Sequence, residues 1–504
     1  MPADIYITPP GSPSFGDESL LTDECVITID GPAGSGKSTT ARAIAGELGL
    51  LYIDTGAMYR ALTWAARQQG IPAKEGDALS QLLRASRLEL VPGRTEPTVL
   101  WNGQNITSAI RSPEVDASVS EVSAHGKVRR VMVERQRAMG RGGGVVMEGR
   151  DIGSVVLPLA QTKIYLDASL PARVERRYRQ YRRAGQEVAR DRIHSELEQR
   201  DRLDSDRSES PLTVSPDAIV LDTSNWSLPE QIVRVKKSIL ASLQQRKRTI
   251  QESARPGDLL LKYRVAYSAM SAMARFYGLR EVWLEGHAVP KGCIIACNHV
   301  SWWDPPIVGA TLRRSRIRTI AKAELFRFPP FGAMFRFLDT IPIQRSGYDS
   351  RAFSAAISSL RAGHNIFIFP EGTRRPIGRP GPVRNGLGIL IQKTRADLLP
   401  VFVRGTCRLE PGGSRLSPLE VWYGPLVRMH ALDHLALLHD SRTINGMIAR
   451  LCETVFRELQ ARSYAETPPS DWELAESRRQ YHARRAKTER LFGGRVGRAS
   501  DSGP

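Results

Sequence analysis

A lysine and a serine stand at the end of a glycine-rich stretch near the N-terminus of the chain. The stretch reads GPAGSGKS from Gly31 to Ser38, after an apolar run at 26–29 and before a helix-forming segment. Glycines let backbone NH groups turn inward around phosphate oxygens, Lys37 can reach the β and γ phosphates, and the Ser38 hydroxyl can ligate Mg²⁺. A chance glycine-rich loop is the alternative, but strand, GxxxxGK[ST] and helix stand here in the required order. The pattern therefore predicts a site for a nucleoside triphosphate with magnesium.

Two more segments place charged groups after apolar strands. Residues 51–53 lead into DTGAMYR, which ends at Arg60, and residues 145–147 lead into EGRDIG, which begins at Glu148. In open α/β sheets the carboxyl ends of the strands are where ligands bind. An arginine-rich segment at 171–185 is read by itself as a solvated helix face. After a phosphate loop it can instead be a lid that closes over the transferred phosphoryl group.

Residues 23–245 as a whole resemble bacterial cytidylate kinase. The resemblance rests on GPAGSGKST, DTGAMYR, EGRDIG, the LDAS before the arginine-rich segment and QRDRLDSDR, in that order. It implies a P-loop nucleoside monophosphate kinase fold, a parallel sheet flanked by helices with a lid. The implied reaction transfers the γ-phosphoryl group of ATP, bound with Mg²⁺ and without a prosthetic group, to CMP or dCMP. UMP as acceptor is a narrower alternative.

The resemblance also implies a role for individual residues of this segment. Glu148 stands where many relatives carry Asp, so the carboxylate is retained. Lys37 and the lid residue Arg177 are the implied catalytic cations. The residues implied to bind ATP are Gly31, Pro32, Ala33, Gly34, Ser35, Gly36, Lys37, Ser38 and Thr39, with Ser38 as the Mg²⁺ ligand. Those implied to bind CMP are Thr55, Arg60, Ser120, Arg129, Arg150, Asp151, Arg200, Asp204 and Arg207.

A histidine and an aspartate five residues apart form the second candidate site. An apolar run at 293–297 precedes His299, and Asp304 precedes two prolines. On one helix the two side chains would diverge by ~140° and would not meet. If His299 ends a strand and Asp304 begins the next helix, the two can fold back within hydrogen-bond reach. A lone histidine is more often structural than catalytic, but the near-continuous apolar run 365–369 leads into a second charged segment, PEGTRR, and two such strand ends suggest one site.

Residues 259–435 resemble the 1-acylglycerol-3-phosphate acyltransferase family. His299 and Asp304 match its first motif and FPEGTR at 369–374 its third, whereas 330–345 and 399–403 look like weaker forms of the second and fourth. The resemblance implies an α/β glycerolipid acyltransferase domain. In it neutral His299 would take the proton of a glycerol hydroxyl as that hydroxyl attacks an acyl thioester, and Asp304 would hold the imidazole tautomer.

The implied substrates are lysophosphatidate and either acyl-CoA or acyl carrier protein, and the product is phosphatidate. The residues implied to bind the acceptor phosphate are Arg345, Glu371, Gly372 and Arg374. Relatives often show Phe-Lys-x-Gly after the third motif, whereas this chain has PVRNG at 382–386, in which Arg384 retains a cation. A catalytically silent lipid-binding domain is the alternative.

Length and charge agree with two α/β domains and anionic ligands. At 504 residues about three domain-sized units fit, and the 41% hydrophobic content excludes wholesale disorder. Short apolar runs alternate with longer amphipathic segments, which predicts α/β architecture. We expect a disordered tail at 1–22, a kinase domain at 23–245, a linker at 246–258, an acyltransferase domain at 259–462 and a basic disordered tail at 463–504. The net charge of +19 favours anionic partners, but the basic residues lack interleaved aromatics, so we expect no nucleic acid.

Five cysteines, an odd number without framework spacing, predict a reducing compartment and hence the cytoplasm. The N-terminus is not a secretory signal, and no apolar run reaches the ~18 residues of a spanning helix. Any contact with an anionic membrane would therefore be peripheral, at its inner face. A helix beginning near Asp258 carries an apolar stripe that includes Tyr263 and Tyr267, which favours packing on its own domain over lying on a membrane.

Overall fold

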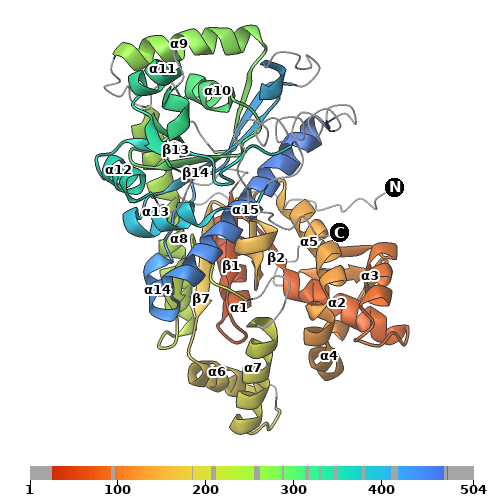
Figure 1. Ribbon diagram of the computed structural model, residues 1–504. Coiled ribbons are helices and arrows are strands. Elements are labelled where there is room, and N and C mark those ends of the chain that lie inside the picture. Colours follow the sequence, from red (N-terminus) through yellow and green to blue (C-terminus); the bar gives the residue numbers. More distant parts are fainter. Residues whose placement is uncertain are drawn as a thin grey trace. The chain divides into compact units, whose positions relative to one another are not determined.

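The computed structural model divides the chain into two compact units. The first comprises residues 1–249 and 429–440, and the second comprises residues 250–428 and 441–504. Each unit is built around its own sheet (Figure 1). The structure describes residues 25–91, 97–183, 185–205, 212–254, 261–285, 289–312, 317–327, 331–344, 349–376, 381–409, 418–469 and 474.

The first unit contains a five-stranded parallel sheet. Its order is β2-β6-β1-β7-β8, and every pair is parallel. The strands are short and apolar because both faces are covered, and Ile27 and Ile29 of the central strand are fully buried. The strands are β1 (Val26–Asp30), β2 (Leu51–Asp54), β6 (Val145–Gly149), β7 (Thr162–Asp167) and β8 (Ile219–Asp222).

Helices cover both faces of this sheet. One apolar cluster joins the strands to Ile44 and Val235, and a second joins them to Met58 and Leu79. A small antiparallel sheet is formed by β3 (Leu88–Val91), β4 (Thr98–Trp101) and β5 (Gln104–Asn105). The helices are α1 (Lys37–Leu48), α2 (Thr55–Gln68), α3 (Gly76–Ala85), α4 (Pro113–Ala124), α5 (Gly126–Gly140), α6 (Leu170–Arg183), α7 (Arg190–Ser205), α8 (Leu228–Ala254) and α14 (Leu432–Leu438).

The second unit contains a seven-stranded mixed sheet of order β12-β11-β13-β10-β14-β15-β9. Among the described strands of this sheet, β14 and β15 form the only antiparallel pair. The central strands β10 and β13 are buried along their whole length. The strands are β9 (Arg280–Trp283), β10 (Ile294–Cys297), β11 (Ile317–Lys322), β12 (Ile341–Ile343), β13 (Asn365–Ile368), β14 (Leu398–Arg404) and β15 (Glu420–Tyr423).

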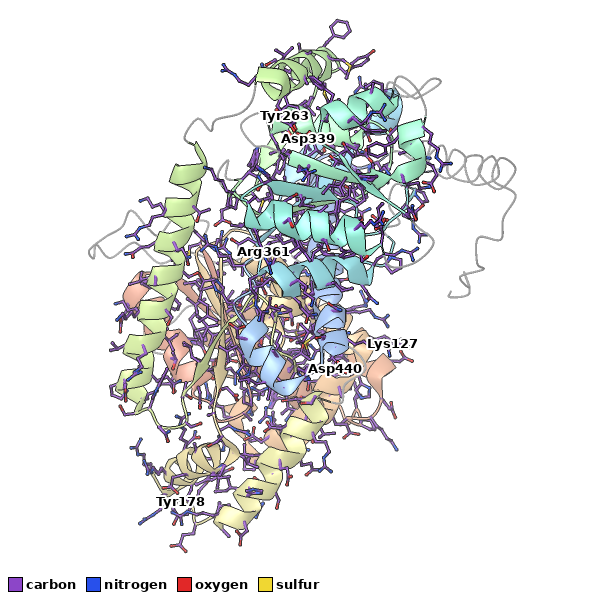
Figure 2. The ribbon with its side chains drawn as sticks, turned by 60° about the vertical axis from the view of Figure 1, so that its left-hand side comes forward. Lys127, Tyr178, Tyr263, Asp339, Arg361 and Asp440 are labelled. Carbon is purple, nitrogen blue, oxygen red and sulfur yellow. The ribbon has the colours of Figure 1, made fainter. Side chains whose placement is uncertain are left out.

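Several helices of the second unit pack against its sheet or against each other. In α9 the side chains of Tyr263 and Tyr267 are buried, and the Tyr263 hydroxyl donates a hydrogen bond to Asp339, which lies just after α11 (Figure 2). The predicted stripe of this helix thus packs on its own unit. The helices are α9 (Leu261–Phe276), α10 (Asp304–Thr311), α11 (Phe331–Phe337), α12 (Ser350–Arg361), α13 (Asn385–Thr394) and α15 (Ser441–Glu466).

The α/β class predicted from the sequence is confirmed, with three differences at the element boundaries. The predicted linker 246–258 is helical as far as Ala254, because α8 continues through it. Residues 429–440 group with the first unit, where the Ala431 amide donates to the Pro216 carbonyl at 2.9 Å. Helix α15 passes the predicted boundary at 462, because the Ser463 hydroxyl donates to the buried Glu420 carboxylate at 3.0 Å. The predicted tail 1–22 lies outside the described residues. So does most of the predicted tail 463–504, of which only residues 463–469 and 474 are described. Within the described helices, none is both long and apolar enough to cross a bilayer.

Candidate active sites

The glycine-rich loop of the first unit turns between β1 and α1 on backbone angles that favour glycine. Gly31 has φ 148°, and a Cβ there would lie 2.1 Å from the Leu166 carbonyl oxygen, so this position excludes any larger residue. The Lys37 side chain is buried, and its ammonium donates to the Pro32 carbonyl at 2.7 Å. Burial, together with the positive charge of Arg150, lowers the pKa of Lys37 well below its ordinary value. The predicted phosphate loop therefore folds around its own lysine.

The ends of β2 and β6 meet beside this loop. The Ser38 hydroxyl donates to Glu148 Oε2 at 2.9 Å, and the Tyr52 hydroxyl donates to the other carboxylate oxygen. Thr55 donates to the Glu148 carbonyl at 2.7 Å. Burial, reinforced by Asp54, raises the pKa of Glu148 to about 7. A hydroxyl and a carboxylate that converge at a helix N-terminus are hard oxygen donors, and this donor set fits Mg²⁺ bound with a triphosphate.

Several of the arginines predicted at this site, both in the acceptor-binding set and in the lid, are paired with carboxylates. Arg60 and Arg177 both pair with Asp116, the latter at 3.8 Å. Arg150 links the phosphate loop to α7, because its guanidinium donates to the Gly31 carbonyl of the loop at 2.6 Å and to Asp204 of α7 at 2.9 Å. Lid helix α6, which carries Arg177, therefore approaches α4, which carries Asp116.

A further pair, formed by Arg129 and Asp151, is buried. The Arg129 guanidinium also donates to the Ser123 carbonyl at 3.3 Å and lies 5.7 Å from the centre of the Tyr59 ring. Ser120 lies one turn before the end of α4, and its carbonyl accepts the Ser123 hydroxyl. The contacts of Arg129 thus extend to the α4 segment that contains Ser120.

Burial and the nearby charge of Arg150 lower the pKa of Arg200 to about 10. This places Arg200 within the same group of cations. The remaining predicted residue, Arg207, lies outside the described residues.

Two carboxylates at this site were not predicted from the sequence. Asp30 ends β1, its oxygens accept the amides of Ile152 and Gly153 at 2.9 and 2.8 Å, and burial raises its pKa to about 6. A charged residue directly before the glycine-rich loop is a signal that sequence reasoning could have used. Asp116 has no such signal, because it stands inside a helix without a motif around it.

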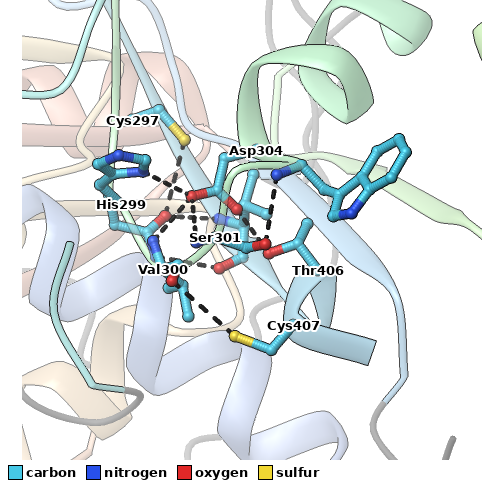
Figure 3. Close-up of polar contacts among 10 residues, drawn as sticks. Cys297, His299, Val300, Ser301, Asp304, Thr406 and Cys407 are labelled. Carbon is cyan, nitrogen blue, oxygen red and sulfur yellow. Dashed lines mark hydrogen bonds and ion pairs between the residues drawn. The ribbon is translucent and has the colours of Figure 1, made fainter. Parts of the chain in front are cut away.

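In the second unit His299 and Asp304 meet as the strand-to-helix arrangement predicts. His299 follows β10, Asp304 begins α10, and His299 Nδ1 lies 2.8 Å from Asp304 Oδ2 (Figure 3). The same oxygen accepts the amides of Val300 and Ser301 at 2.7 and 2.8 Å. Asp304 is fully buried, whereas the His299 side chain retains 17% of its exposure. The imidazole ring stacks on Phe369, with ring centres 3.8 Å apart.

The end of β13 brings the third motif to the same place. The Arg375 amide donates to the His299 carbonyl at 2.7 Å. Glu371 is buried and accepts the Gly381 amide at 2.9 Å, and burial raises its pKa to about 7. Gly372 has φ 67° and turns the chain. The structure thus joins the first and third motifs at one sheet edge.

The Arg374 guanidinium lies 4.5 Å from the centre of the Trp302 ring. Because Trp302 precedes α10, this contact also links the third motif to the first. Arg345, the other predicted phosphate ligand, lies outside the described residues.

A pocket opens beside His299 within the second unit. It is walled by residues after β10 and β13, by the end of β14 and by α15. Its polar lining comes from Asn298, His299, Glu371, Arg375, Arg404, Gln460 and Tyr464, and its apolar lining from Val300, Pro376, Phe402, Val403 and Phe456. The histidine therefore faces a space that offers both cationic and aromatic contacts.

Comparison with known proteins separates the same two parts of the chain. The family model for cytidylate kinase matches residues 27–241, and the family model named Acyltransferase matches residues 282–404. The cytidylate kinase of Geobacillus kaustophilus is 46% identical over 213 residues, which cover 42% of this chain and 95% of that protein. The chain belongs to the cytidylate kinase family, and its second unit contains an acyltransferase domain.

Fused relatives also match the kinase part. A bifunctional pantoate ligase/cytidylate kinase of Synechococcus sp. (strain JA-3-3Ab) is 47% identical over 246 residues, and this match spans 48% of the present chain and only 44% of that relative.

Among solved structures, the crystal structure of the 1-acyl-sn-glycerophosphate acyltransferase PlsC from Thermotoga maritima matches 44% of this chain and 82% of its own chain, at 22% identity and a TM-score of 0.31.

Proposed function

We propose that the chain is a bifunctional enzyme whose first unit phosphorylates CMP or dCMP with ATP. The observation that carries this proposal is the contact of Arg150 with the Gly31 carbonyl, which joins the phosphate loop to the group of paired arginines. A donor site and a site for an anionic acceptor thus adjoin, as in-line phosphoryl transfer requires.

In this proposal the residues of the first unit bind the two substrates and neutralise their negative charge, and none forms a covalent bond to them. Lys37 and the loop amides hold the ATP phosphates, and the arginines exchange their carboxylate partners for the acceptor phosphate and the transferred group. Bound Mg²⁺ would be held by Ser38 with Glu148 beside it, and it neutralises charge on the β and γ phosphates. CDP or dCDP and ADP are the products. A panel of CMP, dCMP, UMP and AMP as acceptors tests the assignment, and faster phosphorylation of UMP than of CMP and dCMP would overturn it.

For the second unit we propose transfer of an acyl group from acyl-CoA or acyl carrier protein to lysophosphatidate. The observation that carries it is the 2.8 Å contact of His299 with a fully buried Asp304. Nδ1–H of His299 donates a hydrogen bond to Asp304, and the unprotonated Nε2 is left to act as the base. Nε2 removes the proton of the acceptor hydroxyl as its oxygen attacks the thioester carbonyl. The tetrahedral adduct expels the thiolate, which takes the proton from the imidazolium.

Arg374 and Arg345, with the loop at Glu371 and Gly372, are the proposed ligands of the acceptor phosphate, because planar guanidinium groups suit that anion. Thioester cleavage followed as free thiol, with and without lysophosphatidate, tests the proposal. Thiol release that depends on the acceptor and disappears in His299→Ala supports it. If CMP phosphorylation proceeds while no donor and acceptor give thiol release, the second unit is a lipid-binding domain without catalysis.

We further propose that the second unit contacts an anionic membrane surface and that the protein is cytoplasmic. Five free cysteines support a reducing compartment. Exposed apolar side chains lie on neighbouring helices, with Val265 and Phe276 on α9 and Phe337 on α11, and exposed Arg264 and Arg275 flank them. In a flotation assay, the fraction of protein bound to vesicles of phosphatidylglycerol should be lower for the double variant Phe276→Ser/Phe337→Ser than for wild type. Vesicles of phosphatidylcholine alone should bind the wild-type protein weakly.

A further inference from the structure

The two oxygens of the Asp304 carboxylate are held from two different parts of the second unit. Oδ2 accepts His299 Nδ1 and the two backbone amides that follow it, whereas Oδ1 accepts the Thr406 hydroxyl at 2.5 Å. Figure 3 shows Thr406 on the side of the carboxylate away from His299. Asp304 and Thr406 both have 0% exposure, so bulk water does not reach Oδ1 and cannot replace the hydrogen bond from this hydroxyl.

Thr406 reaches this position because the chain turns sharply after β14. Gly405 has φ 77°, and a Cβ there would lie 2.0 Å from the Pro418 carbonyl oxygen, so the turn depends on glycine. Thr406 then begins the short helix Thr406–Leu409. The next residue, Cys407, places its sulfur 3.9 Å from the Val300 carbonyl, against the loop that also carries His299.

We propose that Thr406 is a positioning residue for acyl transfer. Its hydroxyl fixes the plane of the Asp304 carboxylate, so that Oδ2 faces His299 Nδ1 and the base is held in one tautomer and orientation. This inference rests on the proposed acyl transfer. A buried acceptor that loses its donor is strongly destabilised, and a carboxylate held at only one of its two oxygens orients the imidazole less well.

The test compares three variants of the full chain. Thr406→Val keeps the shape and removes the hydroxyl, and it should lower kcat of acyl transfer ~10-fold with KM for both substrates unchanged. Thr406→Ser restores the donor and should stay within ~3-fold of wild type. Thr311→Val is the matched control, because it removes a hydroxyl of α10 that bonds the Val308 carbonyl and Tyr423 rather than Asp304. It should leave kcat unchanged.

A double-mutant cycle separates positioning from general stability. If Thr406 acts through Asp304, adding Thr406→Val to Asp304→Asn lowers kcat no further, whereas an independent structural role gives additive losses. Additive losses, an unchanged kcat in Thr406→Val, or a rise in KM alone overturn the proposal.

A second readout does not depend on activity. In protein labelled with ¹⁵N-histidine, the Nδ1 proton of His299, assigned by its loss in His299→Ala, should weaken or shift in Thr406→Val and persist in Thr406→Ser. An unchanged signal in Thr406→Val overturns the proposal. If wild type shows this signal but transfers no acyl group, the proposed function fails, and the signal in the variants still decides whether Thr406 holds the pair.

Discussion

Replacing Asp304 by Asn or by Ala should separate the charge of this carboxylate from its hydrogen bonds. In Asp304→Asn the amide oxygen can take the place of Oδ2 and keep the amides of Val300 and Ser301 bonded, while the Thr406 hydroxyl rotates to accept the amide NH₂. We expect a loss of only about 1–2 kcal/mol in the free energy of unfolding. The charge that stabilises the imidazolium disappears, so kcat of acyl transfer should fall ~10²–10⁴-fold.

In Asp304→Ala the same two amides, which belong to buried residues, lose their acceptor. Each unsatisfied donor costs about 1–3 kcal/mol, so the free energy of unfolding should fall by about 2–6 kcal/mol. Thiol release measures transfer, hydrogen exchange of the amides of β10 measures local stability, and CMP phosphorylation in the same preparation serves as the internal reference. The reasoning is refuted if Asp304→Asn transfers within ~3-fold of wild type, or if the two variants are equally stable.

Three further predictions concern single side chains. Lys37→Met should lower kcat of CMP phosphorylation ~10²–10³-fold and leave acyl transfer unchanged, and a parallel loss of both rates in coupled assays would contradict two independent sites. Arg129→Met leaves Asp151 buried without its partner, so urea denaturation of the first unit should show a loss of about 3–5 kcal/mol, and a loss below ~1 kcal/mol would contradict the buried pair. Because the pKa of Glu371 is raised in the folded state to about 7, wild type should lose stability as pH rises from about 4.5 through 7, whereas Glu371→Gln should not. The free energy of unfolding of the variant relative to wild type, measured by urea denaturation, should therefore rise by up to about 3 kcal/mol between pH 5 and pH 8, and a constant difference would contradict the raised pKa.

The sequence predicted those contacts in which the partners lie close along the chain. The glycine-rich loop between β1 and α1 and the return of Asp304 to His299 both depend on local strand-to-helix geometry, which motif spacing encodes. The α/β class followed from the alternation of apolar runs with amphipathic segments.

The meeting of the strand ends at His299 and at 369–374 was predicted, but most individual side-chain contacts between distant segments were not. Asp116 pairs with Arg60 across 56 residues, and Thr406 bonds Asp304 across 102 residues. Both depend on which elements the sheet order brings together, and a single sequence carries little information about that order. The grouping of residues 429–440 with the first unit was missed for the same reason, because nothing in their composition indicates their partner.

The two sites handle charge in opposite ways, and the proposed reactions explain the difference. In the reaction proposed for the first unit each substrate brings its own negative charge, so Arg60 and Arg177 need only a temporary partner, and the partly exposed Asp116 that they share is suited to be displaced. In the acyl transfer proposed for the second unit, positive charge arises on His299 as it takes the proton of the acceptor hydroxyl. No substrate supplies its counter-charge at Nδ1, so the protein must hold a permanent one there. Four hydrogen bonds and complete burial fix Asp304 in that role, and such preorganisation avoids rearrangement as the imidazolium forms.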